Sequence, residues 1–184
     1  MGNRSSKIIY RIIAAVLCFA VAFCVSGCGG ETEYNMDPET MAKSILEGIS
    51  FDADMQQIRN DSIGTFVELP EDRTGYMFMG DGSHSDSFGV FKFSSSDDAK
   101  TGEKAIKGYL KEVEDSFSRY IPEEAEKVKN HSVIIRKGAN LVFVVSNDEE
   151  AENKVEQFFE GNTVQETAAP VDSSEVSAKP VSGK

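Results

Sequence analysis

Residues 133–146 read VIIRKGANLVFVVS, two apolar runs joined by a short polar segment. β-Branched and aromatic residues dominate both runs, as they do in strands. The joining segment, Lys137-Gly138-Ala139-Asn140, holds the glycine that a tight turn needs, because glycine adopts backbone angles that other residues avoid. The pattern therefore predicts a hairpin of two antiparallel strands, over residues 133–135 and 141–145.

An upstream segment repeats this pattern. Val90-Phe91-Lys92-Phe93-Ser94 aligns with Val142-Phe143-Val144-Val145-Ser146, and the apolar run at residues 76–79 supplies a strand before it. An acid follows three residues after each serine, at Asp97 and at Glu149. Both units therefore have the spacing of a capping box, in which a serine and an acid close the first turn of a helix.

A helix is predicted after each hairpin, over residues 97–120 and 148–160, because apolar residues recur there at steps of three and four. We therefore expect an α+β fold. Two ββα hairpin-helix units form a mostly antiparallel four-stranded sheet, with the helices packed on one face. Residues 55–58 have the pattern of a short strand outside these units. The alternative is that two ordinary hairpins look alike by chance.

The folded part begins with a helix start. Asp37-Pro38-Glu39 combines a capping acid with proline at the first helical position. Residues 37–160 have the length of a single domain. The polar segment 28–36 before them is typical of a tether. Residues 161–184 alternate Ser, Thr, Ala, Val, Pro and Glu without periodicity, which is typical of a disordered tail.

The N-terminus has the parts of an export signal. Arg4, Lys7 and Arg11 form a basic head, and residues 12–25 form an uncharged, almost wholly apolar run. That run is too short to span a bilayer comfortably, since a spanning helix needs about 20 apolar residues. It ends in Val25-Ser26-Gly27-Cys28, which resembles the lipobox of bacterial lipoproteins.

This resemblance implies cleavage between Gly27 and Cys28, which removes residues 1–27 as a signal peptide. It also implies a lipoprotein with acyl chains, such as palmitate, on Cys28, and two chains on one residue anchor a protein firmly. We therefore expect the chain on the extracytoplasmic face of the cell membrane. The alternative is an uncleaved signal anchor in which the cysteine occurs by chance.

The charge of the chain limits its partners. The formal net charge is −12, and removal of Arg4, Lys7 and Arg11 makes it more negative by three. A surface this acidic repels the phosphates of nucleic acid, so we expect no nucleic-acid partner. Solubility alone explains the acidity, and the alternative is a basic partner. The partner class that we expect is an envelope protein.

The cysteines and histidines exclude most metal and redox chemistry. Cys18 and Cys24 leave with the signal peptide, so Cys28 is the only cysteine of the mature chain. The mature chain can form no internal disulfide and no thiolate zinc site. His84 and His131 are too few for a zinc site with protein ligands alone. We expect no cofactor and no metal.

The region from Pro38 to Phe159 resembles the domain of unknown function 4358, which occurs in short secreted lipoproteins of Gram-positive bacteria. The similarity rests on three motifs, at residues 86–92, 120–124 and 133–146. Gly89 departs from the pattern, where a branched residue is expected. The family brings no known activity, so the resemblance implies a fold and a location.

The loop at residues 80–87, GDGSHSDS, contains the one cluster of reactive groups. A serine, a histidine and two aspartates there allow an envelope hydrolase centred on residues 81–86 as an alternative function. Groups so close in sequence seldom make a triad, because its members come from separate elements. The loop also lacks the glycine and the glutamate that a calcium loop needs at its sixth and twelfth positions.

We therefore expect a non-catalytic binding or adaptor module of the cell envelope rather than an enzyme. Its candidate contact surface comprises Tyr76, Phe78, His84 and Asp86, where aromatic side chains adjoin the polar loop. A transporter accessory that binds solutes is a further alternative. One domain of this size lacks the two lobes that usually close on a solute.

Overall fold

The computed structural model describes residues 34–161. The expected signal peptide at 1–27, its cleavage site, the first part of the tether and residues 162–184 of the expected tail lie outside the described residues. The elements, in chain order, are α2 (Pro38–Gly48), β1 (Gln56–Ile58), η2 (Asn60–Ser62), α3 (Ile63–Phe66), β2 (Arg73–Met79), β3 (Ser87–Phe93), α4 (Ser96–Phe117), α5 (Pro122–His131), β4 (Ser132–Lys137), β5 (Asn140–Val145) and α6 (Ala151–Gly161).

Both predicted hairpins are confirmed. β2 pairs with β3, and β4 pairs with β5, each pair antiparallel. Gly138 has a φ of 56° in the second turn, which is the left-handed conformation that favours glycine. The two hairpins join through β3 and β5, where Val90 lies opposite Val142. The two aligned valines of the repeat therefore meet at the centre of the sheet.

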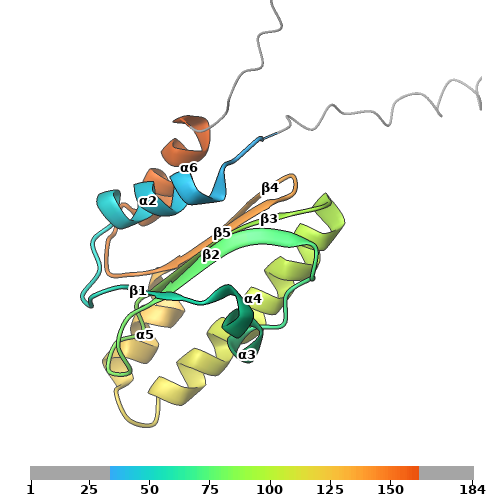
Figure 1. Ribbon diagram of the computed structural model, residues 1–184. Helices are drawn as coiled ribbons and strands as arrows, with labels where there is room; N and C mark the ends of the chain where they lie inside the picture. Colours follow the sequence, from blue (N-terminus) through green and yellow to red (C-terminus); the bar gives the residue numbers. More distant parts are fainter. Residues whose placement is uncertain (1–33, 162–184) are drawn as a thin grey trace, which may run out of the picture.

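The sheet has five strands rather than the predicted four. β1 pairs with the end of β2, which gives the order β1-β2-β3-β5-β4. The prediction that all helices pack on one face is wrong. Figure 1 shows α2 and α6 on one side of the sheet and α3, α4 and α5 on the other. We call these the upper and the lower layer.

Each layer has its own apolar core. Phe88, Val90 and Val142 face the upper layer, whereas Phe91 and Phe143 face the lower one. All six residues of β5 are buried. A strand covered on both faces is apolar at consecutive positions instead of alternate ones. The uninterrupted run LVFVV at residues 141–145 is such a pattern.

The connections after β3 and β5 differ, which explains the two layers. Only residues 94–95 separate β3 from α4, whereas residues 146–150 separate β5 from α6. The longer connection lets α6 cross to the opposite face. The capping boxes also differ from the prediction. Oγ of Ser95 caps α4 by accepting from the N–H of Asp98, and before α6 Oδ1 of Asp148 accepts from the N–H of Glu150.

The last residues of the expected tether pack on the domain. Met36 is 2% exposed within the upper core. Nδ2 of Asn140 donates to the carbonyl of Tyr34 at 2.5 Å, and Nζ of Lys92 donates to Oδ1 of Asn35 at 2.7 Å. Residues 34–36 therefore pack on the domain, although the sequence predicted them as part of the tether.

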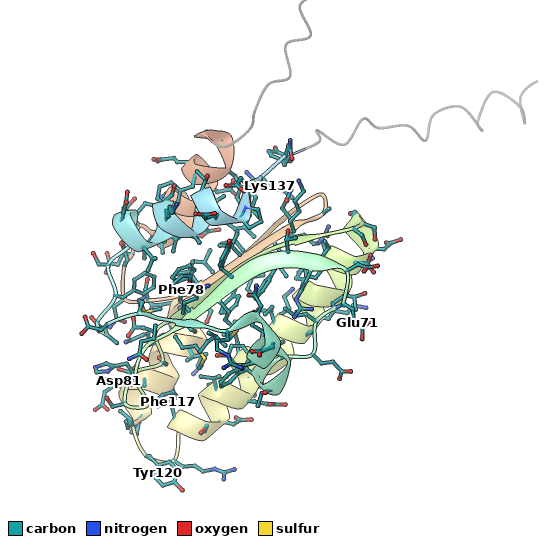
Figure 2. All side chains as sticks on the ribbon, viewed as in Figure 1. Glu71, Phe78, Asp81, Phe117, Tyr120 and Lys137 are labelled. Atoms are coloured by element: carbon teal, nitrogen blue, oxygen red, sulfur yellow. The ribbon has the colours of Figure 1, made fainter. Side chains whose placement is uncertain are left out.

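The turn between α4 and α5 forms one end of the molecule. α4 ends at Phe117, three residues before the predicted end, and Tyr120 is 82% exposed. Figure 2 shows Tyr120 at this tip, opposite the end that carries Lys137. Among residues 34–161, no helix is long and apolar enough to cross a membrane.

Candidate functional site

A groove of about 700 Å³ runs along the outer edge of β2. Its floor is formed by Arg73, Thr74, Gly75 and Tyr76. The beginning of α2 forms the upper wall, and η2 with the first residue of α3 forms the lower wall. Clefts of this size are typical of sites that bind ligands.

The groove exists because β1 pairs with only three of the seven residues of β2. Ile58 pairs with Met77, and the chain then leaves the sheet at Arg59. Ile63, which is 2% exposed, anchors the following turn in the lower core. Residues 73–76 therefore have β3 on one side and no strand on the other among the described residues.

The backbone of Gly75 points into this groove. The N–H of Gly80 donates to the carbonyl of Asp86 at 2.8 Å, and the N–H of Ser94 donates to that of Asp72 at 3.2 Å. Bonding residues alternate along an antiparallel strand. Gly75 lies an odd number of positions from both Asp72 and Gly80, so its N–H and C=O are directed away from β3.

A glycine is required at position 75 for a steric reason. A Cβ atom there would lie 2.2 Å from the carbonyl oxygen of Val90 and 2.6 Å from Cδ1 of Phe91. Any larger residue would displace β3. The consequence is a sheet edge whose backbone carries no side chain at this position, which allows another backbone to approach closely.

Acidic residues predominate around the groove. Its lining includes Asp37, Glu39, Asp61 and Glu71 against a single basic residue, Arg73. Glu39 forms an ion pair with Lys43, and Asp61 forms one with Arg59. The guanidinium of Arg73 donates to the carbonyl of Pro70 at 2.8 Å.

The structure separates the four residues of the expected contact surface. Tyr76 lines the groove. Phe78 is buried in the upper core, where its ring stacks on Phe88 with centroids 4.7 Å apart. His84 and Asp86 lie beyond the opposite end of β2. Figure 2 shows Glu71 and Asp81 on opposite sides of the molecule, one before and one after this strand.

The loop after β2 has the geometry of a turn. Oδ1 of Asp81 accepts from the N–H and from Oγ of Ser83, at 2.9 and 2.5 Å. Nδ1 of His84 lies 2.9 Å from that same oxygen and 3.2 Å from Oγ of Ser83. A triad uses opposite ring nitrogens for serine and acid, which is not the arrangement here. The hydrogen bond to Asp81 raises the pKa of His84.

Asp86 belongs to an ion cluster around the buried ammonium group of Lys127, which the sequence did not predict. Nζ of Lys127 lies 2.8 Å from Oδ2 of Asp52, 2.9 Å from Oδ2 of Asp86 and 3.0 Å from Oε2 of Glu124. The side chain of Lys127 is 2% exposed. Lysine has three N–H donors, so three carboxylates satisfy it completely. We call Asp52, Asp86, Glu124 and Lys127 the ion cluster.

The ion cluster joins three separate segments. Ser85 donates to Oε2 of Glu124 through its N–H at 2.7 Å and through its Oγ at 2.8 Å, which fixes the β2–β3 loop on α5. Burial alone lowers the pKa of Lys127, but its bonds to three carboxylates outweigh burial, so this pKa is raised. Within residues 34–161, no group of three or more His, Cys, Asp or Glu side chains is placed to hold a metal ion.

No signal in the sequence singles out Lys127 or the groove. Lys127 lies among charged residues of α5 and has the pattern of a solvated face. The groove depends on where β1 ends, and apolar periodicity does not fix that point. The polar segment between Ile58 and Ile63 was the available sign that the strand stops there.

The family described as Domain of unknown function (DUF4358) matches residues 50–146, more than half of the chain. No curated protein and no solved structure gives a match. The matched range contains the sheet, the lower layer and the whole ion cluster. The match is narrower than the range of 38–159 expected from the motifs, because α2 and α6 lie outside residues 50–146. The chain therefore belongs to the DUF4358 family of domains of unknown function.

Proposed function

We propose that this protein is an extracytoplasmic lipoprotein, held on the cell membrane by lipid on Cys28, that acts as a non-catalytic binding module of the envelope. Its contact surface is the groove along β2. The observation that carries the proposal for binding is the sheet edge at residues 73–76, which has a groove of about 700 Å³ in place of a neighbouring strand.

The sequence before the domain supports the anchor. Val25-Ser26-Gly27-Cys28 follows a basic head and a short apolar run. Residues 29–33 separate Cys28 from Tyr34, the first described residue. Fully extended, they reach about 20 Å. A domain on so short a connection stays close to the bilayer, with the Lys137 end nearer to it than the Tyr120 tip.

The groove supports binding rather than catalysis. Besides four acids and Arg73, its lining contains the polar residues Asn60, Thr74 and Tyr76, the apolar residues Pro38 and Ile63, and Gly75. The hydrolase alternative requires a triad in the loop at 81–86. There the serine and the acid contact one nitrogen of His84 instead of two. A surface that holds a partner needs no such arrangement.

Membrane fractionation of cells that express Cys28→Ser tests the anchor. We expect the native chain in the membrane fraction and the variant in the medium or in its uncleaved form. Thioether formation requires the sulfur, and serine keeps the size of the side chain. Cys18→Ser, the same substitution in the apolar run and outside the lipobox, is the matched control and should remain on the membrane. Membrane binding of Cys28→Ser equal to that of the native chain, with cleavage unchanged, would contradict the proposal.

A further inference from the structure

We propose that the open edge of β2 binds a basic peptide segment in an extended conformation, which adds to the sheet as a strand beside residues 73–76. This inference rests on the proposed function and specifies the partner of its contact surface. Strand addition is a recurrent way for a sheet to bind a peptide, because main-chain hydrogen bonds supply affinity and side-chain pockets supply specificity.

The backbone of β2 has hydrogen-bonding groups that face the groove. Gly75 directs its N–H and C=O toward the groove, and the alternation of the ladder also turns the carbonyl of Arg73 outward. The N–H of Arg73 donates to the carbonyl of Glu71 at 2.8 Å, so this N–H is not available to an added strand. An added strand would pair with the carbonyl of Arg73 and with both groups of Gly75.

The walls of the groove enclose the edge of β2. The edge lies between the start of α2 above and η2 below, so a bound strand would be held on both faces. Tyr76 is half-buried and packs against the upper core, so its ring offers an apolar surface beside the edge. Thr74 is exposed and leaves the edge accessible.

Charge selects the kind of peptide. Four acids against one arginine give the lining a formal charge of −3. Lys43 and Arg59 compensate two of these acids from outside the groove, whereas the side chain of Glu71 has no ion-pair partner among the described residues. The whole chain has a charge of −12, so a basic segment is attracted at long range as well.

Other occupants fit less well. A second copy of this chain would bring two acidic grooves together, which like charges oppose. The segment 162–184 contains three acids and two lysines, so its charge does not complement the groove. The test distinguishes a second copy and the segment 162–184 from a separate basic peptide.

The test uses the full chain in detergent and a capped peptide of about eight residues, the length of an ordinary strand, with alternating lysine and valine. Two matched probes accompany it. One has glutamate in place of each lysine, and the other carries N-methyl groups on alternate residues, which block pairing with a sheet edge. Hydrogen exchange of the Gly75 amide, followed by NMR, reports pairing at the edge. A titration gives the affinity.

We expect the lysine peptide to slow exchange at Gly75, and the other two probes to have little effect. A groove variant, Glu39→Gln/Asp61→Asn/Glu71→Gln, should weaken binding about tenfold, a change typical of electrostatic complementarity at an interface rim. Its control, Asp54→Asn/Glu112→Gln/Glu123→Gln, makes the same change of charge at exposed positions outside the groove. It should change affinity less than about twofold.

Three results would overturn the inference. Equal binding of the glutamate peptide would leave the groove as a binding site and remove its preference for basic segments. Equal binding of the N-methylated peptide, or no effect at Gly75, would exclude strand addition. Protection of Gly75 before any peptide is added would assign the edge to a second copy if the protein sediments as a dimer, and to residues 162–184 if it is a monomer. Membrane fractionation of Cys28→Ser tests the anchor separately, because that substitution leaves the groove unchanged.

Discussion

Nζ of Lys127 lies 2.9 Å from Oδ2 of Asp86, and these two side chains are 2% and 0% exposed. Asp52 and Glu124 complete the coordination of the ammonium group. Oδ1 of Asp86 also accepts from the N–H of Asp52 at 3.3 Å. The pair therefore holds the segment before β1, the β2–β3 loop and α5 together at one end of the sheet.

Replacement of the lysine should destabilise the domain strongly. Lys127→Met keeps most of the side-chain volume but leaves Asp86 charged, buried and without its cation. Breaking a buried ion pair from one side costs about 3–5 kcal/mol. We expect a decrease of that order in the free energy of unfolding, measured by urea denaturation.

The matched control is Lys111→Met on the exposed face of α4, where the ion pairs are with solvated acids. Surface pairs contribute about 0–1 kcal/mol, so the control should be nearly neutral. A Lys127→Met protein as stable as the control would show that the ion cluster does not stabilise the domain.

The same cluster predicts a dependence of stability on pH. Hydrogen bonding to Lys127 lowers the pKa of Asp52 below its usual 3.8. Burial raises the pKa of Glu124, but bonds from Ser85 and Lys127 outweigh it and lower this pKa below 4.5. Both groups release their protons more readily when folded. Their stabilisation is complete above the unfolded pKa values and is lost as the pH falls through the folded ones.

Urea midpoints should therefore fall progressively as the pH decreases below about 4.5. Asp52→Asn should flatten part of this decline, because one of the two groups no longer titrates. The raised pKa of His84 has the opposite effect at higher pH, because its stabilisation is complete below the unfolded pKa of 6.5 and is lost as the pH rises through the folded one. A midpoint that rises as the pH falls below about 4.5 would contradict the direction of the pKa shifts of Asp52 and Glu124.

Gly89 is a second position at which the structure makes a sharp prediction. A Cβ atom there would lie 2.4 Å from Cε1 of Phe143 and 2.6 Å from Cε2 of Phe91. Gly89→Ala should cost about 1–3 kcal/mol, because an overpacked core has to shift side chains or backbone. Thermal unfolding measures the loss.

Gly108→Ala is the control, and it should have the opposite effect on stability. Gly108 lies inside α4, and nothing lies within 4 Å of a Cβ atom there. Alanine should stabilise the helix by about 0.5–1 kcal/mol. If Gly89→Ala were equally stabilising, the two phenylalanine rings could not occupy the positions described.

The attachment of residues 34–36 predicts a local effect. Nδ2 of Asn140, which is 1% exposed, holds the carbonyl of Tyr34. Asn140→Ala removes that bond and should speed hydrogen exchange and limited proteolysis around residue 34. Leu46→Ala, at an exposed position of α2, is the control. Unchanged protection in Asn140→Ala would mean that the burial of Met36 and the bond from Lys92 to Asn35 fix this segment without Asn140.

Local chemistry made much of the fold predictable. The glycine turn at Gly138 and the cap at Asp37 follow from single residues, and Oδ2 of Asp37 accepts from the N–H of Thr40 as expected. The layering was not predictable from the repeat, because the connection after Val145 decides the side of α6. The departure at Gly89 also has a cause that appears only in three dimensions, since the two rings that exclude a side chain come from different strands.

The site was less predictable than the fold. Tyr76 was among the expected contact residues and does line the groove, but Phe78, two positions further along β2 on the same face, is buried in the upper core. Asp86 was expected at a contact surface and is instead bound to Lys127, more than forty residues away. Such pairings depend on tertiary contacts, which periodicity does not encode.

The most direct test of the lipid-anchored binding module is the intact mass of the protein purified from membranes. We predict the mass of residues 28–184 increased by a diacylglyceryl group, with or without a further acyl chain, and a fragment spectrum that places the addition on Cys28. An unmodified Cys28, or a chain that retains residues 1–27 with a total near 20.1 kDa, would contradict the proposal.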